Sequence, residues 1–205
     1  MNYFDRPEVS NSDLKKLHDK LYPRPNYDPT DAYWFGTVLD AVVTEPERVD
    51  FDNKTVDGQQ VNDIDWCHIL EMKKSFDAEK LCSDILDISD PQKIIVRDMD
   101  FQYGDYSFTM PCRCKYDFYN PYVGADLKST TAQTDEQFIS ACKHFMYFNQ
   151  AYFYMNMGYL HKFLIIGISK INYNVFYVPI HIGSPEYEEG KTSVNELAFW
   201  YNTLM

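Results

Sequence analysis

The stretch from Lys115 to Tyr154 constrains the fold more than any other part of this chain. It passes from one strand pattern through a turn and a second strand pattern into a helix pattern. In residues 121–130 the apolar side chains recur at every second position, at Val123, Ala125 and Leu127. This is the period of a half-buried strand, so Asp126 and Lys128 are expected to share its other face.

A second strand pattern lies directly upstream. Its side chains alternate between two faces, with Arg113, Lys115 and Asp117 on one and Cys112, Cys114 and Tyr116 on the other. Asn120-Pro121 then interrupts the run as a turn does. The two strands are therefore expected to form a hairpin that brings Asp117 beside Asp126.

Two neighbouring carboxylates and a lysine suit one kind of chemistry. Carboxylates held together repel each other and attract a hard divalent cation, and Mg²⁺ needs only one or two of them besides water and phosphate oxygens. A lysine two residues after the second carboxylate can hold an attacking water or the negative charge that develops on a phosphate. The pattern therefore favours in-line hydrolysis of a phosphodiester.

The tripeptide acid-x-Lys is not specific by itself. The chain contains it at Asp13, Asp52, Glu71, Asp126 and Glu189. An isolated copy is more often a surface salt bridge than a catalytic element. Only the copy at Asp126 combines strand alternation, a preceding hairpin partner that ends in Asp, and a capped helix after it.

Composition indicates one folded domain. A chain of 205 residues can bury a sizeable core, and 45% hydrophobic and 17% aromatic residues exclude a disordered class. No signal-peptide pattern and no apolar run of spanning length is present, so a cytoplasmic protein without a membrane partner is expected. The cysteines have neither CxxC nor zinc spacing, so they are expected to be reduced, mostly buried thiols.

The formal charge of −12 opposes a nucleic-acid partner, because affinity for DNA comes largely from Lys and Arg on phosphates. A cation at the carboxylate site would offset part of this charge. A local basic surface that could grip DNA is expected from Lys15, Lys16, Lys20 and Arg24.

The element order predicts a mixed α/β fold. Helices are expected over residues 10–21, 31–45, 64–88 (one or two, broken near 75–77), 134–158 and 193–204, with a loop at 49–62. Helix starts are indicated by the pairs Ser10 and Asp13, Thr134 and Gln137, and Ser193 and Glu196, and Gly158 is the expected left-handed end of the helix over 134–158. In segment 64–88 the expected core residues are Trp66, Ile69, Leu70, Leu81, Ile85 and Leu86, and a turn is expected at Gly104-Asp105. Strands are expected over residues 93–97, 100–103, 106–110, 112–117, 123–128, 163–169 and 175–182. A single domain over residues 1–205 would then have a mainly helical part (1–90), a sheet with a crossover helix (91–182) and a C-terminal helical part (183–205).

Three features follow one another along the chain: Asp117, Asp126-Leu127-Lys128 and the helix segment 149–154. In this order they make the chain resemble the PD-(D/E)XK nuclease superfamily. Within it the chain is most similar to the RecE-type exonucleases, which include exonuclease VIII. Segments 9–14, 35–37 and 45–48 look like the opening motifs of that group. The resemblance covers roughly residues 9–180 and implies a restriction-endonuclease-like central mixed sheet flanked by helices.

The resemblance also implies roles for individual residues. Asp117, Asp126 and the backbone carbonyl of Leu127 would bind the catalytic Mg²⁺ or Mn²⁺, and Lys128 would position or activate water. Gln150 and Tyr154, spaced i and i+4 on one helical face, match the family's Gln and Tyr, which support the site and the substrate phosphates.

One position departs from the group's pattern. Where the exonucleases usually have His in Gly-Thr-x-x-His, this chain has Asp40 after Gly36-Thr37. A carboxylate at that position can still ligate a hard metal, so Asp40 is a further expected metal ligand.

The expected function is a metal-dependent exonuclease on double-stranded DNA ends in phage-type recombination, in a bacterial or phage-infected cell. The family further implies ring-shaped homo-oligomers and a single-strand annealing partner protein. Two alternatives stay open: a restriction- or repair-type endonuclease, and a non-catalytic descendant that binds DNA or a protein.

Overall fold

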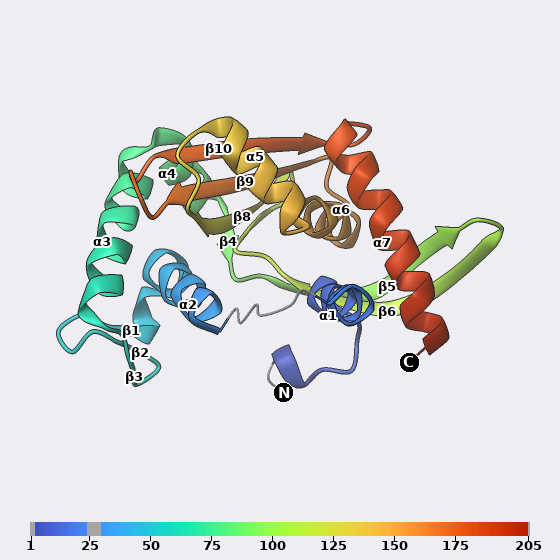
Figure 1. The fold of residues 1–205 in the computed structure, drawn as a ribbon, viewed down its shortest axis with the longest axis horizontal. Helices are drawn as coiled ribbons and strands as arrows, with labels where there is room; N and C mark the ends of the chain where they lie inside the picture. Colours follow the sequence, from blue (N-terminus) through green and yellow to red (C-terminus); the bar gives the residue numbers. More distant parts are fainter. Residues whose placement is uncertain (1–2, 24–29, 205) are drawn as a thin grey trace.

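The computed structural model describes residues 3–23 and 30–204 and has the mixed α/β architecture expected from the sequence (Figure 1). Its helices are α1 Asn11–Leu21, α2 Thr30–Thr44, α3 Asp63–Ala78, α4 Lys80–Ile88, α5 Asp135–His144, α6 Tyr147–Gly158 and α7 Pro185–Leu204, with 3-10 turns η1 Tyr3–Asp5 and η2 Pro46–Arg48. Its strands are β1 Val49–Asp50, β2 Thr55–Val56, β3 Gln59–Gln60, β4 Asp90–Pro91, β5 Ile94–Tyr103, β6 Tyr106–Lys115, β7 Phe118–Asn120, β8 Val123–Thr130, β9 Lys162–Ser169 and β10 Val175–His181.

The central sheet has five strands in the order β10-β9-β8-β7-β4. Strands β8 and β9 run parallel, whereas the other neighbouring pairs are antiparallel. A parallel pair needs a long crossover connection, and α5 and α6 provide it. A hairpin into β8 with its turn after Asn120 is confirmed, and Phe118 lies opposite Ala125. Its first strand is β7 and not the predicted segment 112–117, because residues 112–115 pair with β5 in a separate sheet.

Each face of this sheet packs against its own hydrophobic core. Ala125 and Leu127 of β8 belong to the core shared with α2, α3 and α4. Ile165, the partner of Asp126 on β9, belongs to the other core, which includes side chains of α5, α6 and α7. Asp126 and Lys128 therefore lie on the face covered by the crossover helices, as the strand alternation predicted.

Hairpin β5–β6 forms a separate two-stranded sheet that extends away from the central sheet beside α7 and α1 (Figure 1). The four short strands predicted here were wrong in one respect, because the chain forms two continuous strands that pair from Ile94–Lys115 to Tyr103–Tyr106. Gly104 adopts a φ of 57° in the two-residue turn, which confirms the turn prediction. Pro111 does not break β6, because an edge strand tolerates a missing N–H.

The predicted helix over residues 134–158 is two helices. Met146 adopts a left-handed conformation with a φ of 61°, and a right-handed helix cannot continue through such a residue. The left-handed residue at the C-terminal end of α6 is Tyr159, not the predicted Gly158. At the start of α5, Thr134 caps the helix as predicted, but the side chain of Gln137 accepts a hydrogen bond from Gln133 N instead of from Thr134.

The N-terminal part confirms the first helix and its capping box between Ser10 and Asp13. The predicted loop at 49–62 instead contains the short strands β1, β2 and β3. The break between α3 and α4 lies at Glu79, later than predicted.

Two residues predicted in the core of this region, Leu70 and Leu81, are 39% and 44% exposed. Met72 and Phe76 are buried instead. Trp66, Ile69 and Ile85 are buried as predicted, so the expected core stripe was wrong at Leu70 and Leu81 alone among these five residues.

The last helix begins at Pro185, eight residues before the predicted start at 193. The Ser193 and Glu196 pattern that indicated a start lies inside α7. No helix within the described residues is both long and apolar enough to cross a membrane.

Candidate functional site

The turn between β6 and β7 carries Asp117 into the sheet. Gln92 N donates to Asp117 O at 3.1 Å, which fixes the backbone there. Leu127 N donates to Asp117 Oδ2 at 2.8 Å, so the carboxyl is tied to the backbone of β8 and is 8% exposed. The register of β7 and β8 thus places Asp117 beside Asp126, as the hairpin predicted.

Asp126 is the centre of the polar contacts. It is 3% exposed, and its Oδ1 accepts a hydrogen bond from Gln150 Nε2 on α6. Its Oδ2 forms an ion pair with Lys128 Nζ and makes no aligned hydrogen bond within the described residues. The structure therefore brings together Asp126, Lys128 and Gln150 from two elements.

Asp40 reaches the same group from the C-terminal half of α2. Burial raises the pKa of its carboxyl to about 7, and the charge of Asp126 contributes to the increase. Lys128 and Lys115 act in the opposite direction. Because Asp40 and Asp117 also interact electrostatically, three carboxyl groups share one region of the protein.

The electrostatics of the other two groups follow from burial and from each other. Burial raises the pKa of Asp117 well above its usual range, and Asp126 and Asp40 raise it further. Burial alone would lower the pKa of Lys128, but Asp126, Tyr147 and Asp117 outweigh that effect and raise it. Lys128 is therefore charged at neutral pH and carries positive charge into a cluster of carboxyl groups.

Tyr154 lies in the core behind this cluster. Its ring packs against Tyr116 at 5.0 Å and Phe163 at 5.9 Å between centroids, and the residue is 8% exposed. Burial raises the pKa of its hydroxyl, with smaller effects from Asp126 and Asp117. Within the described residues, no hydrogen bond joins Tyr154 to Asp117 or Asp126. Of the two residues predicted to support the site from this helix, Gln150 therefore contacts Asp126, and Tyr154 does not.

Sequence reasoning missed Tyr147. Its ring lies 4.9 Å from Lys128 Nζ, on the first turn of α6 and one turn before Gln150. The i, i+3 spacing to Gln150 is the signal that could have found it. The backbone carbonyl of Leu127 stays a predicted ligand. The hydrogen bond from Leu127 to the carboxylate cluster is through its N–H, which donates to Asp117.

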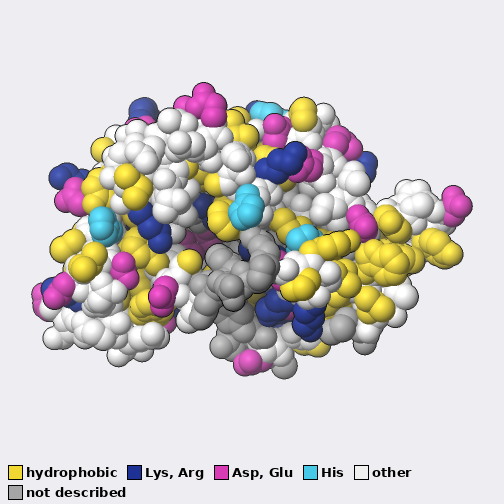
Figure 2. Space-filling model, viewed as in Figure 1, with side chains coloured by type: hydrophobic (Ala, Val, Ile, Leu, Met, Phe, Trp, Pro, Cys, Tyr) yellow, Lys and Arg dark blue, Asp and Glu magenta, His cyan; other side chains and the backbone are white. Residues whose placement is uncertain are grey.

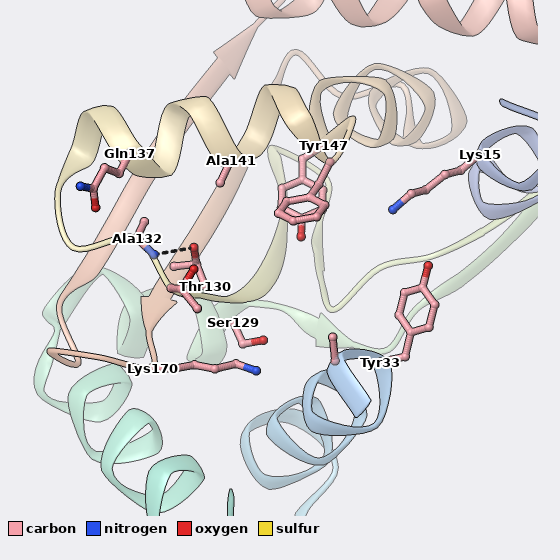
Figure 3. Close-up of a pocket in the computed structure, with 12 residues that line it drawn as sticks. Lys15, Tyr33, Ser129, Thr130, Ala132, Gln137, Ala141, Tyr147 and Lys170 are labelled. Atoms are coloured by element: carbon pink, nitrogen blue, oxygen red, sulfur yellow. Dashed lines mark hydrogen bonds between the residues drawn. The ribbon is translucent and has the colours of Figure 1, made fainter. Parts of the chain in front are cut away.

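A cavity of about 430 Å³ adjoins the cluster, lined in part by Ser129 and Thr130, which follow Lys128 on β8 (Figure 3). Figure 3 shows Lys15 and Lys170 entering it from opposite sides, with Tyr147 between them on the α6 side. The carboxylate cluster therefore has a neighbouring space that is open to a ligand.

The donor set fits a weakly protein-bound divalent cation. Asp40, Asp117 and Asp126 offer hard oxygen atoms, and Asp126 Oδ2 has only the Lys128 ammonium as its partner within the described residues. Within the described residues, no group of three or more His, Cys, Asp or Glu is placed so that it could hold a metal ion. Mg²⁺ or Mn²⁺ would accordingly be held by one or two of these carboxylates, with water and substrate oxygens completing the shell.

The basic surface predicted near the N-terminus is only partly described. Lys16 forms an ion pair with Asp13, and Arg24 lies outside the described residues. Figure 2 shows Lys and Arg side chains in separate groups interspersed with acidic ones on this face. The visible face is thus charge-mixed, without one continuous basic surface.

Comparison with known proteins assigns no family to this chain. No protein-family model matches the chain, and no curated protein matches it. Among solved structures, the crystal structure of SSO0001 aligns with a TM-score of 0.40 and 13% identity, over 94% of this chain and 84% of that one.

Proposed function

We propose that this protein is a Mg²⁺- or Mn²⁺-dependent deoxyribonuclease that hydrolyses phosphodiesters as an exonuclease from duplex DNA ends, in phage-type recombination. One observation carries the proposal: Asp117, Asp126 and Lys128 meet at one place on the central sheet, although Asp117 lies in the turn before β7 and the other two lie on β8. Two carboxylates and a lysine in this arrangement suit phosphodiester hydrolysis.

Each residue would have a distinct task. Asp126 and Asp117 would hold the cation, which when bound supplies a polarised water and neutralises phosphate charge. Lys128 would stabilise the negative charge that develops on the phosphate oxygens. Gln150 would keep the Asp126 carboxylate in place through its hydrogen bond to Oδ1, and Asp40 would supply further negative charge from α2.

An end-labelled duplex assay tests the activity. The wild-type protein is expected to release labelled product with Mg²⁺ or Mn²⁺ and none with excess chelator. Covalently closed circular DNA distinguishes the two nuclease classes, because an exonuclease leaves circles intact and an endonuclease of restriction or repair type nicks them.

One observation favours a second candidate, a binding protein without catalysis. Lys128 forms an ion pair with Asp126 Oδ2, the atom that a metal would need. If the wild-type protein binds duplex DNA but releases no product with either cation, the non-catalytic descendant is correct and the catalytic proposal is wrong.

The proposed partners follow from the same family resemblance. Duplex DNA ends are the proposed substrate, and a ring-shaped homo-oligomer and a single-strand annealing protein are the proposed assemblies. Sedimentation of the purified protein, alone and with linear duplex, is the measurement that tests the oligomer.

A further inference from the structure

The cavity of about 430 Å³ beside Lys128 has the composition of a ligand site. The end of β8 and the segment after it form one side, α5 and the start of α6 form another, and the first turn of α2 contributes Ala32 and Tyr33. The volume falls within the range of about 300–1,000 Å³ that small-molecule sites occupy. No carboxylate is among the described residues that line it, so it suits an anion despite the negative net charge.

Lys170 is the strongest pointer to an anion. It lies in the turn between β9 and β10, where its backbone N donates to Thr130 O at 2.7 Å. Its ammonium lies 3.5 Å from the centroid of the Phe35 ring, and burial lowers its pKa. Within residues 3–23 and 30–204 this ammonium has no hydrogen bond or ion pair, although the charge of Asp65 acts on it and partly offsets the effect of burial on its pKa. A part-buried cation is thus aimed into the cavity.

The second lysine comes from a different part of the fold. Lys15 on α1 points into the cavity from the side opposite Lys170 (Figure 3). The two lysines therefore place positive charge on opposite sides of the cavity, which favours an anionic ligand over a cationic one.

The remaining wall is aromatic. Phe145 and Tyr147 stack with 5.8 Å between ring centroids and 26° between ring planes, and Tyr33 faces the cavity from α2. Aromatic side chains next to ammonium groups are the combination that holds a base and its phosphate in proteins that bind single nucleic-acid strands. An inorganic anion alone would leave this wall unused.

We propose that the cavity binds one deoxynucleoside monophosphate unit, with Lys170 on its phosphate, Lys15 adding positive charge from the opposite side, and the wall of Tyr33, Phe145 and Tyr147 against its base. The inference rests on the proposed function, since there the unit is the nucleotide next to the scissile bond. The same chemistry is offered by a strand terminus and by a free mononucleotide.

Calorimetric binding in excess chelator tests the site without catalysis. The probes are dAMP, deoxyadenosine and inorganic phosphate, added to wild type, Lys170→Ala and Lys162→Ala. Lys162 is an exposed lysine at the start of β9 outside the cavity, so its variant is the matched control. We expect dAMP to bind more tightly than either fragment, and Lys170→Ala to weaken it by about tenfold or more, with no change in Lys162→Ala.

The inference is overturned if wild type does not bind dAMP at millimolar concentration, or if Lys170→Ala binds it as well as wild type does. Thermal unfolding of both variants, with Lys170→Arg as the charge-preserving variant, checks that a loss of binding is not a loss of folding. Lys170→Arg is expected to retain most of the affinity.

Cleavage kinetics separate the two sources of the ligand. If the terminal unit of a strand occupies the cavity, Lys170→Ala raises KM for end-labelled duplex with little change in kcat. If KM is unchanged while dAMP binding is weakened, the cavity takes the free mononucleotide. If the protein binds dAMP but cleaves no DNA, the nucleotide site is supported and the proposed nuclease function is wrong. If it cleaves DNA but does not bind dAMP, the nuclease function is supported and the nucleotide site is wrong.

Discussion

Lys128 is the residue on which the chemistry depends most. Its ammonium is held by Asp126 and covered on one side by the ring of Tyr147. Removing one partner of a buried ion pair leaves the other uncompensated, so a variant at this position affects both folding and activity.

We therefore predict that Lys128→Ala lowers the cleavage rate by about a hundredfold or more, because the charge developing on the phosphate loses its cation. Single-turnover cleavage of an end-labelled duplex measures it, at a temperature where circular dichroism shows the variant folded. Lys162→Ala, a change of the same type on an exposed residue, should cleave like wild type. Cleavage by Lys128→Ala at the wild-type rate would remove Lys128 from the site.

Asp40 gives a pH prediction. Its pKa is about 7 in the folded protein and about 3.9 in an unfolded chain. Between about pH 4 and pH 7, Asp40 is therefore protonated in the folded state and ionised in the unfolded state. Stability then falls as the pH rises through this interval, and the penalty is complete above the folded pKa. Asp40→Asn removes the penalty.

The expected result is a higher Tm for Asp40→Asn than for wild type at pH 8, with a difference that shrinks toward pH 4. Thermal unfolding in excess chelator across this range measures it, since bound metal would stabilise the wild-type carboxylate. An equal Tm difference at pH 4 and pH 8 would contradict the burial of an ionised Asp40 next to Asp126 and Asp117.

At the level of single residues, the strand period and the turn were enough to place Asp117, Asp126 and Lys128 together. Tyr154 shows the limit of that reasoning. An i, i+4 spacing puts Gln150 and Tyr154 on one side of α6, but which of them reaches Asp126 depends on how the helix is rotated against the sheet. Gln150 donates to Asp126, whereas Tyr154 packs against Tyr116 and Phe163.

Helix α7 crosses α6 at very short range, and Gly190 makes this possible. A Cβ at Gly190 would lie 2.2 Å from Phe148 O, a backbone atom that cannot move aside without shifting α6. Because α6 also carries Gln150 and Tyr147, this contact helps to set the distance between the helix and the carboxylate cluster.

We predict that Gly190→Ala destabilises the protein by about 1–3 kcal/mol, the usual cost of overpacking. Gly36→Ala is the matched control: Gly36 lies within α2, and an added Cβ there meets nothing within 4 Å. It should stabilise by about 0.5–1 kcal/mol through helix propensity alone. Urea unfolding of both variants measures the change in the free energy of unfolding, which should be negative for Gly190→Ala and positive for Gly36→Ala. An unchanged stability of Gly190→Ala would contradict the close α6–α7 contact.

The elements that were predicted with wrong limits share a cause. The two strands of the β5–β6 hairpin were each divided because Asp98 and Pro111 look like interruptions in the sequence, yet these residues pair with each other. Residues 134–158 were predicted as one helix because their apolar period continues across Met146. The left-handed backbone of Met146, which ends the first helix, cannot be seen in that pattern.

For the whole molecule, the charge of −12 limits how DNA can approach. Figure 2 shows acidic and basic side chains intermixed on the visible face, so long-range attraction toward a phosphate backbone is weak there. Affinity would then come from a few local contacts, such as those of Lys15 and Lys170 in the cavity.

We therefore predict a shallow salt dependence. The logarithm of the duplex association constant should fall with the logarithm of the salt concentration with a slope of about −3 or shallower, which corresponds to about three phosphate contacts. Fluorescence anisotropy in chelator measures this slope. The double variant Lys15→Ala/Lys170→Ala should make it shallower by about 2, and a steep wild-type slope would show that a larger basic surface engages DNA.

The sequence by itself determined the mixed α/β class, strand β8 and the turn that precedes it, the crossover between β8 and β9, and the shared face of Asp126 and Lys128. These depend on short-range period and turn chemistry, which neighbouring residues specify. Only the tertiary structure decided that Asp40 joins the cluster from α2, that Tyr147 covers Lys128, and that Lys15 and Lys170 face each other across one cavity. Those contacts join segments that are distant along the chain, and their geometry is set by the packing of α2 and α6 against the sheet.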